Sequence, residues 1–135
     1  MSETEAAFVK LELQLQFLEA AMADTAFVVS HLVKDLNSSL DAGEQNAELQ
    51  AAEHQLRTLL HQIRACAQQE IETEEQVYEG QRLYRELLHQ FETTTHDFTV
   101  RATALAASLP PEEQADVQGH LAVLRSFRED FSALN

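Results

Sequence analysis

Apolar residues recur at intervals of three and four along most of this chain, and this spacing restricts it to a helical fold. Only three Gly and two Pro occur in 135 residues, so few positions can form tight turns. We therefore predict an all-α fold in a single helical domain over residues 1–135. The clearest apolar series alternates steps of three and four with one polar member, as in a coiled coil: Phe8, Leu11, Leu15, Leu18, Met22, Thr25, Val29, Leu32 and Leu36.

Capping residues and turn formers divide the chain into predicted helices. Ser2 and Glu5 fit a capping box, which predicts a first helix over about residues 3–37. The segment NSSLDAG then supplies turn formers, and Asp41 with Glu44 can open a second helix. The second helix ends by residue 108 because the sequence Pro-Pro follows. Pro110 ends the preceding helix, and Pro111, Glu112 and Glu113 then suit the first turn of a last helix over residues 111–134.

The stretch from Gln68 to Gln81, QQEIETEEQVYEGQ, decides between an extended rod and a compact bundle. A heptad series keeps its register across this stretch, and all its members but one are apolar or aromatic: Leu49, Leu56, Ile63, Glu70, Val77, Tyr84, Phe91, Phe98 and Leu105. Glu and Gln are also good helix formers. We therefore predict one long central helix over about residues 44–108, on the order of 95 Å long. The first helix would pack on its first half as an extended antiparallel coiled-coil hairpin, with the short C-terminal helix packed back.

The alternative is an up-down four-helix bundle. Thr73 with Gln76 could form a capping box, which is the best local evidence for a break in the helix. The bundle alternative ends a helix at Glu79, with Gly80 as its left-handed C-cap. In such a bundle, helices of the same chain would cover surfaces that a hairpin leaves exposed.

The first helix carries a second, weaker apolar stripe on the face opposite the main series. Its members are Leu13, Phe17, Ala20 and Phe27, and Asp24 divides them. An isolated hairpin would leave this stripe in water, where it would form a sizeable apolar patch. We predict that these five residues bind a protein partner, either a second copy or a different helical subunit. The alternative is that another helix of the chain covers them.

Charge and composition exclude several classes of function. The formal net charge is −14, which disfavours binding to nucleic acid and to anionic membrane surfaces. No apolar run approaches the roughly 20 residues of a membrane span, and the acidic N-terminus does not resemble a signal peptide. The single cysteine, Cys66, cannot form an internal disulfide. We expect a soluble, cytoplasmic protein, with a nuclear location also compatible.

Neither metal nor catalytic chemistry is expected. Four of the six histidines fall on one outward line of the predicted central helix, spaced too far apart for neighbours to share a metal ion: His54, His61, His89 and His96. Glu86 and His89 have the Glu-x-x-His spacing of di-iron bundles, but the motif occurs once where such a site needs it twice. We therefore predict no enzyme, no metal, no cofactor and no small-molecule substrate.

The segment SHLVKDLNSS contains His31 and Lys34 at His-x-x-Lys spacing. This resembles the centre of histidine phosphotransfer domains, which are acidic and all-helical. The resemblance implies that His31 would be phosphorylated and that Lys34 would favour the phosphoryl group. Asp35 departs from the pattern, because that family has glycine there. An anion at this position would stand where a response regulator must approach.

We predict a non-catalytic coiled-coil interaction subunit, adaptor or scaffold of a larger intracellular assembly. The segment KLELQLQ, the long predicted helix and the Pro-Glu-Glu opening of the last helix are similar to features of small coiled-coil subunits in spindle and kinetochore assemblies, one example of this class. The alternatives are a histidine phosphotransfer domain and an acidic bacterial chaperone or immunity-type protein that masks a basic client.

Overall fold

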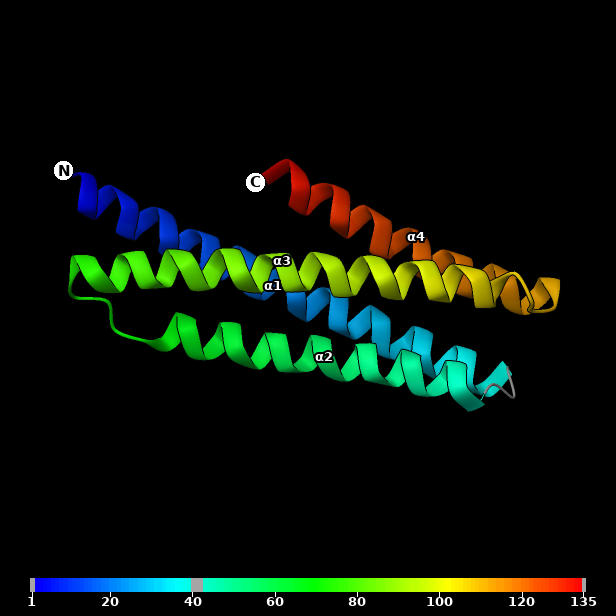
Figure 1. Cartoon of the computed structure of the whole chain (residues 1–135). Helices are drawn as coiled ribbons and strands as arrows, with labels where there is room; N and C mark the ends of the chain where they lie inside the picture. The colour runs from blue at the N-terminus through cyan, green and yellow to red at the C-terminus, as the bar shows by residue number, and fades with distance from the viewer. Residues whose placement is uncertain (1, 40–42, 135) are drawn as a thin grey trace.

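The protein is an up-down bundle of four helices. The computed structural model describes the backbone of residues 2–39 and 43–134 and the side chains of residues 2–37 and 47–129. Within these ranges the chain forms four helices and no strand, which confirms the all-α prediction. The helices are α1 (Glu3–Ser39), α2 (Gly43–Gln68), α3 (Glu74–Ala106) and α4 (Pro111–Leu134). Each runs antiparallel to the one before it (Figure 1).

Two helices form the centre of the bundle. α1 and α3 contact each other and both remaining helices, whereas no contact joins α2 to α4 among the described residues. α2 and α4 therefore lie on opposite flanks of the central pair (Figure 1). α4 ends well short of the end of the bundle where α1 begins and where α2 connects to α3 (Figure 1).

The prediction of one continuous helix over residues 44–108 is wrong. α2 ends at Gln68, α3 begins at Glu74, and the chain reverses direction between them. Thr73 is the N-cap of α3, and its Oγ1 accepts a hydrogen bond from the Gln76 backbone N–H at 3.2 Å. In return the Gln76 Oε1 accepts from the backbone N–H groups of Thr73, at 3.0 Å, and Glu72, at 2.6 Å. The capping box in the bundle alternative is thus confirmed, but the left-handed cap is not, since Gly80 lies inside α3 without a positive φ.

The preserved heptad spacing led to the wrong prediction because two separate helices can share the same spacing as one continuous helix. Ile63 and Val77 are two heptads apart in sequence, yet each is buried on its own helix. α2 and α3 both pack against α1. The five-residue connection between them keeps the buried residues of α3 on the same seven-residue spacing as those of α2. Folding back allows α3 to bury its apolar face on α1, a gain that a long exposed rod forgoes.

The main apolar series of α1 faces this core as predicted. All nine members are buried except Phe8, which is partly buried, and they include the single polar member, Thr25. α4 begins at Pro111 as predicted and buries Val117, Leu121 and Leu124. The predicted Ser2 cap is present, because the Ser2 Oγ accepts from the Glu5 backbone N–H at 3.1 Å. The capping box expected of Asp41 and Glu44 lies outside the described residues.

Candidate functional site

The five predicted partner-binding residues all lie on the side of α1 that faces solvent. Exposed fractions are 48% for Leu13, 51% for Phe17 and 67% for Phe27, and Ala20 and Asp24 are exposed as well. They follow one another at steps of three or four residues, so they share one helix face. α3 packs on the inner side of α1 and the other two helices pack on its flanks, so no described helix covers this face. The alternative that the chain covers it itself is therefore wrong.

The same face extends beyond the predicted residues at both ends. Val9, four residues before Leu13, is 44% exposed, and sequence analysis missed it although the same spacing would have identified it. After Phe27, the next steps of four and three reach His31 and Lys34, which are also exposed. We call this line the outer stripe, and its members are Val9, Leu13, Phe17, Ala20, Asp24, Phe27, His31 and Lys34.

A shallow groove of about 430 Å³ lies beside Phe27, between α1 and α2. Small apolar side chains line it, namely Ala23 and Ala26 of α1, together with the partly buried Leu60 of α2. Two arginines of α2 also line the groove. Arg57 is bound to Glu53 at 2.5 Å, and Arg64 to Glu19 of α1 at 3.1 Å.

The two ends of the outer stripe differ in charge. Near Phe27 the flanking cations are Lys34 and the two groove arginines, Arg57 and Arg64. Toward the start of α1 the charged residues are mainly acidic, namely Glu3, Glu5 and Glu12, with Lys10 among them. A ligand that lies along the whole stripe would therefore meet acids at one end and charges of both signs at the other, because Arg57 and Arg64 are paired with glutamates and Asp24 lies on the stripe.

The structure brings the predicted phosphotransfer histidine against the partner-binding residues. The ring of Phe27 meets the His31 ring edge-on, with 4.6 Å between centroids. On the α4 side, His120 stacks on His31 at 6.0 Å. Asp35 Oδ2 lies 3.4 Å from the His120 Nδ1, close enough for charge attraction when His120 is protonated, although this nitrogen has no aligned hydrogen-bond acceptor among the described residues.

The predicted single line of histidines is divided. His54 and His61 lie on α2 whereas His89 and His96 lie on α3, and all four are exposed. Across the described part of the chain, no group of three His, Cys, Asp or Glu side chains is arranged to hold a metal ion. The Glu86 carboxylate of the isolated Glu-x-x-His motif instead pairs with Arg82 at 3.0 Å.

Comparison with known proteins adds no further assignment to this four-helix bundle. The chain matches no protein-family model, and neither a curated protein nor a solved structure is significantly similar to it. Among the described residues, no helix has the length and apolar character needed to cross a membrane.

Proposed function

We propose that the protein is a non-catalytic interaction subunit and that its outer stripe binds an amphipathic helix of a partner protein. One observation carries the proposal: two phenylalanines and a leucine stand about half exposed or more in a single line on α1. The fold does not bury these side chains. Fully burying a side chain of this kind contributes roughly 1.5–3 kcal/mol, so a partner that covers them gains a substantial hydrophobic driving force.

The length of the stripe suits a helical partner. Val9 and Phe27 are 18 residues apart, which corresponds to about 27 Å along α1, or five helical turns. A helix with apolar residues at steps of three and four would meet the stripe along this length. Ala20 keeps the middle low enough for close approach, and the groove beside Phe27 can receive one apolar side chain of the partner.

Charge favours a different protein over a second copy. With a net charge of −14, two copies repel each other wherever their acidic surfaces meet. A partner helix with basic residues at one end would instead complement Glu3 and Glu5.

Replacement of Phe17 and Phe27 by Glu tests this proposal. Because both side chains are exposed, we expect the double variant to keep its helical content and thermal stability while association is lost. A photo-crosslinking amino acid at position 13, introduced in the cells that produce the protein, should capture one dominant protein with wild type and none with the double variant. The crosslinked species is identified by mass spectrometry.

A matched control places the same charges elsewhere on the bundle. Tyr78 and Val100 of α3 are exposed by 61% and 55% and lie outside the outer stripe. Tyr78→Glu with Val100→Glu should leave crosslinking unchanged. Equal loss in both double variants, or unfolding of the Phe17→Glu, Phe27→Glu variant, would contradict the proposal, since the effect would then not belong to this surface.

Phosphotransfer remains a second candidate because His31 is exposed on a helix of a four-helix bundle, with Lys34 one turn further on. The Asp35 carboxylate, which departs from the family pattern, lies beside His120 of α4. Incubation with a phosphorylated response regulator should then place an acid-labile phosphoryl group on wild type and none on His31→Gln. Absence of label on the wild-type protein would eliminate this candidate.

A further inference from the structure

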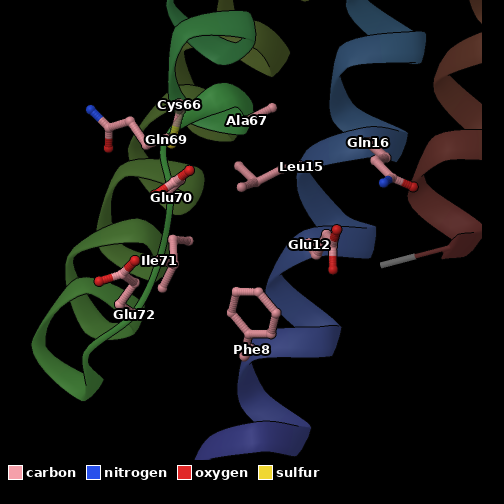
Figure 2. Close-up of a pocket in the computed structure, with 10 residues that line it drawn as sticks. All are labelled: Phe8, Glu12, Leu15, Gln16, Cys66, Ala67, Gln69, Glu70, Ile71 and Glu72. Carbon is pink, nitrogen blue, oxygen red and sulfur yellow. The ribbon is translucent and has the colours of Figure 1, made fainter.

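A second concave site lies at the other end of the bundle, separate from the outer stripe. It is a cleft of about 430 Å³ between the first turns of α1 and the connection from α2 to α3. Figure 2 shows Phe8 and Leu15 of α1 facing Cys66 and Ile71 across it. The cleft has the size of a small-molecule site, and apolar side chains form most of its interior.

The cleft exists because α2 ends before it reaches the first turns of α1, whereas α3 continues alongside them. A Cβ atom on Gly80 would lie 2.7 Å from the Leu11 Cδ2, so the backbone of α3 approaches α1 closely here. α2, in contrast, has ended at Gln68, and the connection 69–73 takes its place beside α1. From that connection only Ile71 packs against the core, so the space next to Phe8 stays partly unfilled.

The wall formed by the connection is held in place. The Gln76 side chain accepts hydrogen bonds from the backbone N–H groups of Glu72 and Thr73, which fixes the connection to the first turn of α3. The Ile71 Cδ1 lies 3.8 Å from the position of a Cβ on Gly80, so this side chain reaches the place where α1 and α3 meet. The cleft is thus largely formed before a ligand arrives.

Three glutamates are among the residues that line the cleft. Glu12 projects from α1, and Glu70 and Glu72 project from the connection. All three are exposed, and none of their side chains pairs with a cation of the described residues. We propose that this cleft binds a small lipophilic cation, a molecule with a compact aromatic or alkyl body and a terminal ammonium group. The body would lie against Phe8, Leu15 and Ile71, and the ammonium group would meet the carboxylates.

Selectivity for charge follows from this arrangement. Each exposed carboxylate contributes little, but three of one sign around a partly apolar cleft add up. An anion of the same shape would be repelled by them and by the net charge of −14. This inference does not rest on the proposed partner-binding function, because none of the outer-stripe residues lines the cleft.

Cys66 supplies a direct measurement of occupancy. It is the only cysteine of the chain, and it lines the cleft. Alkylation by iodoacetamide, followed by intact mass, therefore reports on this site alone. We expect phenylbutylamine to slow alkylation in a saturable way. The neutral phenylbutanol should require about three- to tenfold higher concentrations, and the anionic phenylbutyrate more still.

Two pairs of variants separate the cleft from nonspecific effects. Ala67 is exposed and lines the cleft, whereas Ala65 is exposed and does not. Ala67→Trp should abolish phenylbutylamine binding in titration calorimetry, and Ala65→Trp should leave it unchanged. Glu70→Gln with Glu72→Gln should remove most of the preference for the amine over the alcohol. Glu112→Gln with Glu113→Gln makes the same change in net charge at the opposite end of the bundle and should retain the preference.

The result that overturns the inference is equally specific. Equal protection of Cys66 by the amine and the carboxylate would show that the acids do not select the ligand. Absence of protection by all three probes, or unchanged amine binding in the Ala67→Trp variant, would show that the cleft is not a binding site. Each of these outcomes leaves the outer-stripe crosslinking experiment unaffected.

Discussion

Gly80 occupies a position in α3 where the side chain of Leu11 takes the space of a Cβ atom. Leu11 is completely buried, so a larger residue at position 80 would have to displace core atoms. The favoured sequence prediction placed Gly80 inside a helix, and the bundle alternative placed it at a helix end because glycine commonly ends helices. The close approach of two helices is the other common reason for a buried glycine, and only the tertiary structure distinguishes the two.

Substitutions of Gly80 and Gly119 should have opposite effects on stability. Gly80→Leu should lower the free energy of unfolding by roughly 2–4 kcal/mol because it overpacks the contact with Leu11. Gly119 lies inside α4 with open space around it, so Gly119→Ala should raise that free energy by up to about 1 kcal/mol through helix propensity. Urea denaturation measures both. A neutral Gly80→Leu substitution would be inconsistent with the packing of α1 on α3.

The thiol of Cys66 should react slowly at neutral pH. Burial raises its pKa, so the thiolate forms at higher pH than in an unfolded chain. A raised pKa also means that the protonated thiol contributes to the free energy of unfolding. This contribution is full below the thiol pKa of the unfolded chain and is lost as pH rises through the pKa of the folded protein. The pH profile of iodoacetamide alkylation should lie to the alkaline side of that of a cysteine peptide. A coincident profile would contradict the burial of this thiol.

At the scale of helices, the sequence predicted α1 and α4 well, and the break between α2 and α3 poorly. Ser2, Pro110 and Pro111 are strong local signals, and the structure begins or ends helices next to them. Between Gln68 and Glu74 the local signals conflict, because Glu and Gln favour helix while Thr73 and Gln76 favour a new start. The packing of α3 on α1 resolved the conflict in favour of the cap.

The capping box of α3 should contribute measurably to stability. Thr73→Ala removes the side-chain acceptor for the Gln76 backbone N–H, and we expect a loss of about 1 kcal/mol in urea denaturation. Thr93 is exposed inside α3, so Thr93→Ala should be neutral or slightly stabilising and serves as the control. Helical content by circular dichroism should not increase in Thr73→Ala. An increase would mean that α2 and α3 tend to fuse when the cap is absent.

The outer stripe is a property of one helix, and for that reason the sequence located it. Steps of three and four place Leu13, Phe17 and Phe27 on a common face whatever the rest of the chain does. The sequence did not determine whether another helix would cover that face. α4 does return to α1, with His120 reaching His31, but it packs on the flank and not over the stripe.

At the scale of the whole molecule, the bundle is little more than half as long as the predicted hairpin. Its longest helix, α1, has 37 residues and spans about 55 Å. Small-angle scattering should therefore give a maximum dimension near 60 Å for the monomer, against about 95 Å or more for a continuous central helix. The Phe17→Glu, Phe27→Glu variant should give the same monomer profile. A maximum dimension near 95 Å at low concentration would favour the hairpin.

The sequence by itself determined the helical class, the apolar face that each helix buries and the second apolar face of α1, because these depend on residue spacing along a single helix. The tertiary structure alone decided that the chain turns at residues 69–73, that Gly80 is a packing contact, and that a cleft opens between α1 and the connection from α2 to α3. These features depend on which helices meet and how far each extends. They are decided by how much apolar surface distant segments bury against one another, and a local sequence pattern does not give this information.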